Sequence, residues 1–195
     1  MISLELRDPF EAFRAWYAEA VAREADVPNA MALATARDGV PSVRVVLMKE
    51  FEPTGIVFFT NLESRKSREL AENPRASVVF HWKSLQRQVL AAGGVERVTD
   101  PEADAYFVTR PRGSQLGAWA SAQSRPLASR EQLDLGLSEV VFRFEEGAVP
   151  RPDFWGGFRL RPDRIEFWQG RRDRLHDRVE FTRTPDGWSR RLLYP

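Results

Sequence analysis

The chain has 195 residues, 43% of them hydrophobic and 29% charged, and its 29 basic and 28 acidic side chains leave a formal net charge of +1. This composition is typical of a globular protein with a sizeable core. The near-zero charge argues against nucleic-acid or membrane partners. No cysteine is present, which excludes disulfides and thiolate chemistry, and two scattered histidines argue against a metal site.

The start of the chain lacks the apolar core of a signal peptide, and no apolar run approaches the ~18 residues of a membrane helix. We therefore expect a cytoplasmic protein built as a single domain over residues 1–195. Only three of the basic residues are lysines, namely Lys49, Lys66 and Lys83. A lysine kept in so arginine-rich a chain favours a site that needs an ammonium group.

The first predicted element is a helix over about residues 8–25, because Asp8-Pro9-Phe10-Glu11 supplies an N-cap, a proline and a capping-box glutamate. Strands over 30–36 and 40–49 flank the hairpin turn Arg37-Asp38-Gly39. The pair Gly93-Gly94 predicts a bulge or barrel corner. Further strands are expected at 56–60, 76–82, 86–98, 157–160, 164–168, 174–182 and 188–192, and further helices at 64–72, 100–109 and 129–145.

Hairpin-length connections between many short strands predict a mainly antiparallel sheet, and closure into a barrel would remove its edges. The expected fold class is α+β, an antiparallel barrel with helices packed outside it. The strands over about 155–195 are expected to complete the barrel.

Several cationic motifs indicate sites for anions. The segment Arg44–Lys49 is a predicted strand with a cation at each end, and its five-residue spacing allows one shared ligand only if the strand bulges or ends between them. Arg65 and Lys66 open a predicted helix, where the partial positive charge disfavours cations unless an anion binds. The alternative for each motif is a pair of solvated charges.

A second phosphate would suit Tyr106 and Arg110, which share a helix face, with Ser114 just beyond them. The following stretch up to Ser124 is small and polar and indicates close backbone approach to a ligand. Gln86-Arg87-Gln88 has the alternation of an ordinary polar strand face, and His81 is interpreted as a packed structural histidine. No phosphate-binding P-loop, dinucleotide-binding glycine motif or nucleophile elbow is present.

The stretch from Glu166 to Gly170, followed by Arg174 to Arg178, is the most informative of the chain. In a strand, Arg174, His176 and Arg178 would share one face. Two guanidiniums beside a histidine repel one another unless something anionic or electron-rich lies over them. The pattern therefore predicts a site for a charged planar ligand, with a solvated face as the alternative.

Together these segments resemble the pyridoxine (pyridoxamine) 5′-phosphate oxidase family over about residues 8–195. The specific pieces are Arg44–Lys49, Thr60–Lys66, Arg87-Gln88-Val89, Arg110-Pro111, Ser114–Trp119, Phe154–Gly157, Glu166–Gly170 and Arg174–Arg178. The resemblance implies a split β-barrel and a homodimer that holds FMN at the subunit interface. It also implies oxidation of pyridoxamine or pyridoxine 5′-phosphate at C4′ by FMN, with dioxygen as the final acceptor, giving pyridoxal 5′-phosphate and hydrogen peroxide.

The resemblance also implies roles for individual residues. The FMN positions would be Arg44, Lys49, Phe59, Thr60, Arg65, Lys66, Gln88, Gln123, Ser124, Trp168 and Arg178. The substrate positions would be Lys49, Tyr106, Arg110, Ser114, Arg174 and His176, with Arg174 and His176 closest to the chemistry. Phe59 departs from the family, which often has tyrosine there, so only a backbone contact is expected from it.

Two other functions are compatible with the sequence. One is a related split-barrel flavoenzyme with another substrate, such as a phenazine-pathway relative or a flavin reductase. The other is a non-catalytic protein that stores flavin or pyridoxal phosphate. Tyr106 and Arg110 suit a phosphorylated pyridine as substrate, which argues against the first alternative. Peroxide formation would exclude the second.

Overall fold

The computed structural model describes residues 7–24 and 26–195. The first residues, which we expect not to be a signal peptide, lie mostly outside these ranges. The helices are α1 Pro9–Arg23, α2 Arg65–Glu72, α3 Asp100–Val108, α4 Arg112–Ala120, α5 Arg130–Arg143 and the short 3-10 helix η1 Arg172–Arg174. The strands are β1 Ala30–Arg37, β2 Val40–Leu47, β3 Glu50–Glu52, β4 Gly55–Asn61, β5 Arg75–Trp82, β6 Arg87–Arg97, β7 Trp155–Gln169, β8 Asp177–Thr184 and β9 Gly187–Leu192. No helix in the described ranges is long and apolar enough to cross a membrane.

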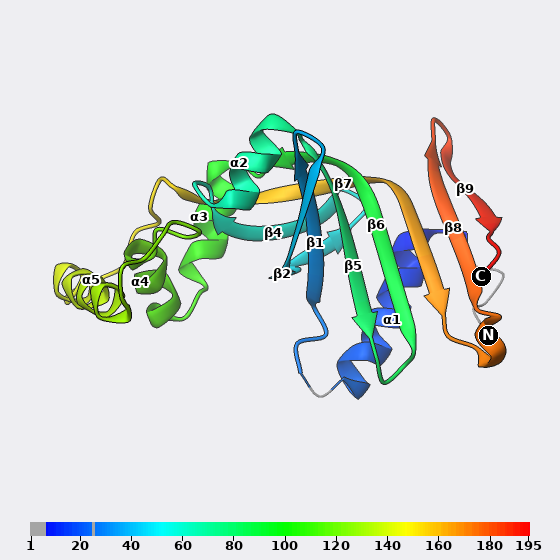
Figure 1. The fold of residues 1–195 in the computed structure, drawn as a ribbon, viewed down its shortest axis with the longest axis horizontal. Coiled ribbons are helices and arrows are strands. Elements are labelled where there is room, and N and C mark those ends of the chain that lie inside the picture. Colours follow the sequence, from blue (N-terminus) through cyan, green and yellow to red (C-terminus); the bar gives the residue numbers. More distant parts are fainter. Residues whose placement is uncertain (1–6, 25) are drawn as a thin grey trace.

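All nine described strands belong to one antiparallel sheet, which confirms the predicted α+β class (Figure 1). The strand order is β2-β1-β5-β6-β7-β4-β3, and β8 and β9 continue from β7. The sheet is not closed by hydrogen bonds, so the closure expected from the strand pattern does not occur, whereas the split β-barrel implied by the resemblance is confirmed. A cleft lined by β2 and β4 opens where a closed barrel would have a seam, and the fold is a split barrel.

The bulge predicted at Gly93-Gly94 is confirmed and explains the length of β7. The β6–β7 register shifts between Ala92 and Gly93. A Cβ atom on Gly93 would lie 2.0 Å from the carbonyl oxygen of Arg161, whereas Gly94 has nothing within 4 Å. The backbones therefore approach at a point where only glycine fits. The bulge lets β7 bend without breaking, so the two strands expected at 157–160 and 164–168 form one strand.

Helix α1 covers the inner face of the sheet with aromatic side chains. The Asp8 side chain accepts the backbone N–H groups of Phe10 (2.7 Å) and Glu11 (3.0 Å), which confirms the predicted cap. Phe13 is buried and stacks on Phe51, with ring centroids 3.5 Å apart. The helix ends at Arg23, two residues before the expected end.

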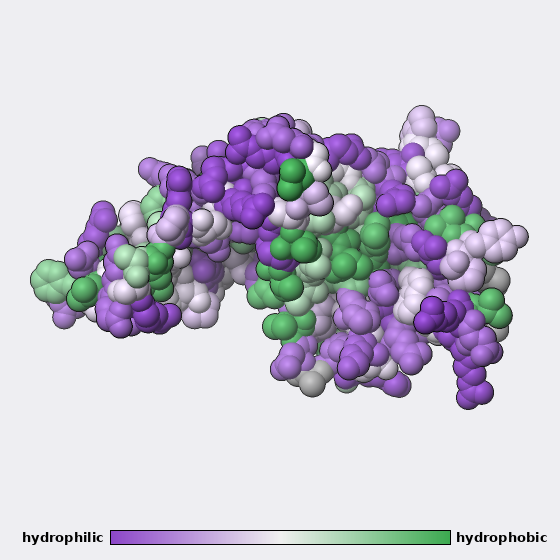
Figure 2. Space-filling view, in the orientation of Figure 1, coloured by the Kyte–Doolittle hydropathy of each residue, from purple (hydrophilic) through white to green (hydrophobic). Residues whose placement is uncertain are grey.

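The opposite, outer face of the sheet has an uncovered apolar centre. Val45, Ala32, Val79 and Leu90 form one cross-strand row from β2 to β6. Val43 and Val45 are 70% and 68% exposed, and the hydrophobic patch is visible at the centre of Figure 2. Adjacent exposed apolar side chains on a sheet are typical of an interface.

His81 points to this outer face and is exposed, so its interpretation as a packed histidine is wrong. Its neighbours Phe80 and Trp82 are both buried. Because strand side chains alternate, the residue between two core aromatics must face outward.

Candidate functional site

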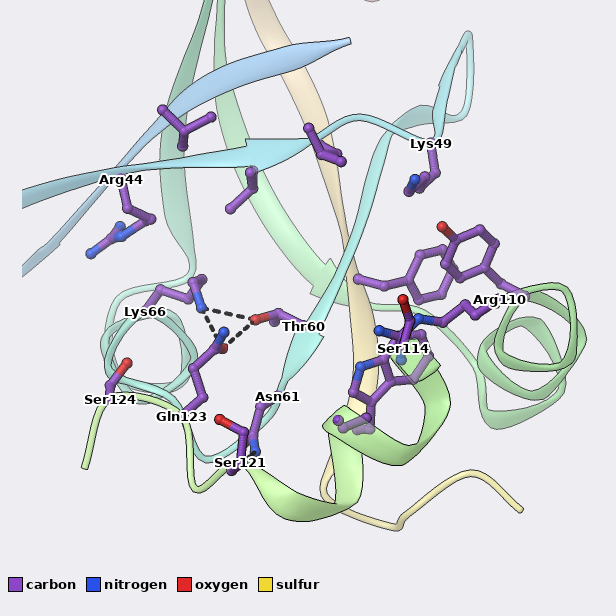
Figure 3. Close-up of a pocket in the computed structure, with 18 of the residues that line it drawn as sticks. Arg44, Lys49, Thr60, Asn61, Lys66, Arg110, Ser114, Ser121, Gln123 and Ser124 are labelled. Carbon is purple, nitrogen blue, oxygen red and sulfur yellow. Dashed lines mark hydrogen bonds between the residues drawn. The ribbon is translucent and has the colours of Figure 1, made fainter. Parts of the chain in front are cut away.

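A cleft of about 980 Å³ lies between β2, β4, the start of α2 and the α3–α4 region (Figure 3). It brings together most of the predicted site residues, which are separated by up to 80 positions in the sequence. The predicted residues that line it are Arg44, Lys49, Phe59, Thr60, Arg65, Lys66, Tyr106, Arg110, Ser114, Gln123 and Ser124.

Arg44 and Lys49 both line the cleft because the strand that carries Arg44 ends between them. Strand β2 stops at Leu47, and the Lys49 N–H then donates to the Val57 carbonyl of β4 at 2.8 Å. The chain has thus turned from one sheet edge to the other. This arrangement satisfies the condition set by their spacing.

The start of α2 carries a buried cation. Arg65 and Lys66 are its first two residues, and the Ser64 side chain makes no capping bond. Lys66 is 7% exposed, and its ammonium donates to Thr60 Oγ1 (2.8 Å), Gln123 Oε1 (2.9 Å) and Ser64 Oγ (3.0 Å). Burial, reinforced by the charge of Arg44 and opposed by Glu69, lowers the pKa of Lys66 to about 8.

Glu69, one helical turn after Arg65, is a residue that the sequence analysis missed. Its carboxylate accepts from Arg65 Nε at 2.8 Å and from Arg44 Nη2 at 3.0 Å, while Ser42 and Thr35 donate to it as well. Burial alone would raise the pKa of Glu69, but these hydrogen bonds outweigh it and lower the pKa to about 2. Glu69 is therefore ionised at neutral pH.

The other end of the cleft combines aromatic rings with cations. Phe59 stacks on Tyr106 (4.2 Å between centroids, 13° between planes) and on Trp155 (5.4 Å, 4°). The Arg110 guanidinium lies 4.7 Å from the Trp155 centroid, and Lys49 Nζ lies 5.3 Å from that of Tyr106. The rings form a flat wall with a cation at each side.

Arg110 has an unsatisfied donor. Its buried Nη1 atom has no hydrogen-bond partner among the described residues, and burial lowers the pKa of the guanidinium. In Figure 3, Arg110 and Ser114 lie together at one side of the cleft, and Arg44 and Lys66 lie at the other. An anion beside Arg110 would satisfy the donor and offset the desolvation.

The stretch around Ser114–Trp119 forms helix α4, which the sequence analysis did not predict. Gln115 is buried and its amide donates to the Phe107 carbonyl at 3.0 Å, and the Trp119 indole donates to the Pro150 carbonyl at 2.8 Å. These bonds dock α4 on α3 and on the segment before β7. The small residues Gly117 and Ala118 are then left facing the cleft.

Five predicted site residues do not line this cleft. Gln88, Trp168 and Arg178 are successive cross-strand partners on β6, β7 and β8, and the His176 ring lies 4.6 Å from the Trp168 centroid. Arg178 Nε donates to Glu166 at 2.8 Å, and this hydrogen bond raises the pKa of Arg178. Arg174 precedes this group in η1. Gln88, Trp168, His176 and Arg178 form an outer-face cluster, and Arg174 lies two residues before His176 in the chain.

The strand predicted over 174–182 begins only at Asp177, so Arg174, His176 and Arg178 do not share a strand face as expected. Asp173 and Arg174 adopt left-handed backbone angles, with φ of 55° and 60°, and the chain makes the turn from β7 into β8 there. His176 Nδ1 accepts the Arg171 backbone N–H at 3.1 Å. The turn, not strand alternation, sets the positions of Arg174 and His176.

Comparison with known protein families identifies two adjoining matches. Residues 17–144 match the family model described as pyridoxamine 5′-phosphate oxidase. Residues 155–195 match the one described as the pyridoxine 5′-phosphate oxidase C-terminal dimerisation region. The chain belongs to the pyridoxamine 5′-phosphate oxidase family. Membership supports an oxidase-class enzyme with a flavin cofactor, and the dimerisation match supports a homodimer.

Relatives within this oxidase family are similar along almost their whole length. The pyridoxine/pyridoxamine 5′-phosphate oxidase of Brucella canis is 54% identical over 191 residues, covering 96% of this chain and 94% of the relative. That of Rubrobacter xylanophilus is 55% identical over 189 residues, covering 96% and 87%.

Solved structures extend the comparison. PhzG from Burkholderia lata, in complex with tetrahydrophenazine-1-carboxylic acid, has a TM-score of 0.93 at 32% identity and covers 100% of this chain and 96% of that one. A related FMN-binding protein from Nostoc punctiforme has a TM-score of 0.75 at 16% identity, covering 94% and 97%, and it supports the fold alone.

Proposed function

We propose that this protein is an FMN-dependent oxidase that converts pyridoxamine or pyridoxine 5′-phosphate and dioxygen to pyridoxal 5′-phosphate and hydrogen peroxide. The observation that carries the proposal is a single cleft with two cationic groups: Arg44, Arg65 and Lys66 lie at one side, and Arg110 and Lys49 lie beside the aromatic wall at the other. Two phosphate esters, one on the cofactor and one on the substrate, fit such a cleft. The names of the Brucella and Rubrobacter relatives support the same substrates.

The cofactor phosphate would bind to Arg44, Arg65 and Lys66, where the free amides of α2 add to the cations. Thr60 and Gln123, now bonded to Lys66, would turn toward the same ligand. FMN bound there would supply the redox chemistry, taking a hydride equivalent from the substrate and passing electrons to dioxygen. Phe59 presents only its ring and backbone, consistent with its lack of a hydroxyl.

The substrate phosphate would bind at the other side, on Arg110, Tyr106, Ser114 and Lys49. The unsatisfied Nη1 of Arg110 would donate to a phosphate oxygen, and the Ser114 hydroxyl is exposed to the cleft. Lys49 lies beside the Tyr106 ring, on the same side of the cleft as Arg110. The chain thus holds its substrate by charge at one end and leaves the reactive ring free.

The outer-face cluster would complete the site from a second copy of the chain. The uncovered apolar row of Val45, Ala32, Val79 and Leu90 lies between the cleft and Gln88, Trp168 and Arg178. A twofold axis through this row would carry the cluster of each copy to the cleft of the other. The dimerisation match over residues 155–195, which contain Trp168 and Arg178, supports this arrangement.

Arg174 and His176 would then contact the substrate ring and hold its reactive carbon against the cofactor. The Arg171 N–H already occupies His176 Nδ1, so the neutral ring carries its proton on Nε2 and presents a donor to the ligand. The Trp168 indole packs against one side of the His176 imidazole ring.

The decisive experiment is anaerobic addition of pyridoxamine 5′-phosphate to the purified flavin-loaded protein, followed by air, with the visible spectrum recorded throughout. We expect the flavin band to bleach and then return with formation of peroxide. A yellow protein that does not bleach would keep the cofactor and exclude the substrate. A protein that takes up no FMN would exclude the oxidase.

A second candidate function follows from the similarity to PhzG, which was solved with a tetrahydrophenazine carboxylic acid. Such a ring system would stack on the flat wall of Phe59, Tyr106 and Trp155, and Arg110 would donate hydrogen bonds to its carboxylate. Bleaching by a reduced phenazine carboxylic acid, without bleaching by pyridoxamine 5′-phosphate, would favour this function.

A further inference from the structure

One buried carboxylate joins two of the cations at the cofactor end of the cleft. Glu69 is 4% exposed. Its Oε1 atom accepts from Arg65 on its own helix, and its Oε2 atom accepts from Arg44 on β2. A single side chain thus ties α2 to the edge strand of the sheet.

The hydroxyl groups around Glu69 hold it in this position. Ser42 Oγ donates to Oε2 at 2.6 Å, and Thr35 donates to the same oxygen. Arg44 also donates to both hydroxyls and to the Leu33 carbonyl at 3.2 Å. Arg44 is therefore fixed by Glu69 and by two hydroxyl groups that are themselves bonded to Glu69, with the Leu33 carbonyl as a further acceptor.

Arg65 is held differently, because only its Nε atom is bonded to Glu69. Its side chain is 62% exposed, and no other hydrogen bond of its guanidinium is found within residues 7–24 and 26–195. The contact at Nε orients the guanidinium plane and leaves both terminal nitrogens available. Two parallel N–H donors on one guanidinium suit a phosphate.

We infer that Glu69 is a positioning residue that orients Arg44 and Arg65 for the phosphate group of the cofactor. The inference rests on the proposed function, since it names what sets the geometry of that phosphate site. Glu69 itself would not touch the ligand: it does not line the cleft, and a carboxylate repels a phosphate.

This repulsion makes the inference sharply testable. If Glu69 acted only through its charge, replacing it with neutral glutamine would strengthen phosphate binding. If Glu69 orients the arginines, the same change would weaken binding, because the amide group of glutamine presents a donor to groups that are already donors. The sign of the change in affinity separates the two roles.

The experiment compares Glu69→Gln with Glu72→Gln, a matched control on the same helix whose exposed side chain pairs with Arg37 at 2.8 Å. Dissociation constants of FMN and of riboflavin, which lacks the phosphate, are measured on the apoproteins by fluorescence quenching. We expect Glu69→Gln to weaken FMN binding by roughly tenfold or more and to change riboflavin binding far less. Glu72→Gln should leave the ratio of FMN affinity to riboflavin affinity at the wild-type value.

A second variant covers the case in which Glu69→Gln fails to fold. Glu69→Asp keeps the charge but is one methylene too short to contact both arginines, so it should also lower the ratio of FMN affinity to riboflavin affinity. An unchanged or higher ratio in the folded variant would overturn the positioning role. A wild-type protein that binds riboflavin as tightly as FMN would overturn the phosphate site itself, and the inference with it.

Discussion

The guanidinium of Arg110 lies 4.7 Å from the Trp155 ring centroid while one of its buried nitrogens has no hydrogen-bond partner within the described residues. The ring compensates the charge only in part, since burial still lowers the pKa of Arg110. A desolvated donor of this kind is costly unless a ligand completes it. An anion bound beside Arg110 would satisfy this donor and offset the desolvation of the guanidinium.

Replacing Arg110 with alanine should remove the main contact to the substrate phosphate. Loss of a charge-assisted hydrogen bond in a partly buried site costs roughly 3 kcal/mol, or about 100-fold in kcat/KM. FMN content should not change, because Arg110 lies across the cleft from Arg44 and Lys66. Steady-state kinetics with pyridoxamine 5′-phosphate measures the loss, and Arg130→Ala, at an exposed arginine that pairs with Asp134, serves as control.

The lowered pKa of Lys66 predicts how cofactor binding depends on pH. Burial lowers the pKa of Lys66 to about 8 in the free protein, and a bound phosphate would raise it again. FMN affinity should therefore be nearly constant between about pH 7 and pH 8, where the FMN phosphate is a dianion, and fall by up to about tenfold per pH unit above pH 8. A Lys66→Arg variant, which keeps its charge, should show no such inflection; an unaltered inflection there would assign the titration to another group.

The apolar outer face predicts that dimerisation and flavin binding are coupled. Val79 belongs to the exposed row but does not line the cleft. Val79→Asp should therefore shift the protein to a monomer, measured by analytical ultracentrifugation, and lower FMN affinity because the outer-face cluster no longer reaches the cleft. Val21→Asp, at an exposed position on α1, should do neither. A monomer that binds FMN as well as the wild type would refute a shared site.

The bulge offers a paired test of the fold. Gly93→Ala would put a methyl group 2.0 Å from the Arg161 carbonyl oxygen, whereas Gly94→Ala meets no atom within 4 Å. The first should lower the free energy of unfolding by roughly 2–4 kcal/mol, and the second should change it by less than about 0.5 kcal/mol. Chemical denaturation measures both, and equal stabilities would mean that the bulge can relax without cost.

The sequence predicts those parts of the protein that depend on local chemistry. The Asp8 cap, the bulge at Gly93 and the hairpin at Asp38-Gly39, where both residues adopt the positive φ of the predicted turn (50° and 76°), follow from residue types at adjacent positions. The convergence of Arg44, Lys66 and Arg110 in one cleft depends on strand pairing between distant segments. Only the family resemblance led to it from the sequence.

The missed features have a common physical cause. Glu69 reads as a surface acid on an exposed helix, and only the packing of α2 against Thr35 and Ser42 makes it a buried acceptor. Helix α4 has two weak helix formers, Gly113 and Gly117, and is held by tertiary hydrogen bonds such as that of Gln115. The turn at Arg174 needs left-handed backbone angles, and a run of charged residues without glycine does not predict such angles.

The turn between β7 and β8 carries Arg174 and His176, the two residues proposed to contact the substrate ring. Two consecutive non-glycine residues with left-handed φ, Asp173 and Arg174, cost of order 1 kcal/mol each and are typical of functional sites. If the strain serves to aim Arg174 and His176 at the substrate ring, Arg174→Ala and His176→Ala should lower turnover per bound flavin while FMN content stays at the wild-type level. Arg172→Ala, at an exposed position two residues before Arg174, should change neither quantity.

Single-turnover reduction of the flavin by pyridoxamine 5′-phosphate under anaerobic conditions isolates the step in which these residues act. A slower bleaching rate in Arg174→Ala with unchanged reoxidation by air would assign Arg174 to substrate alignment. Loss of flavin with normal turnover of what remains would instead make the residue part of the cofactor site. Trp168 and Arg178 pair across β7 and β8, and Arg174 lies in the turn that joins these two strands. A role of Arg174 in substrate alignment is therefore separated from a role in flavin binding only by measuring flavin content and bleaching rate on the same samples.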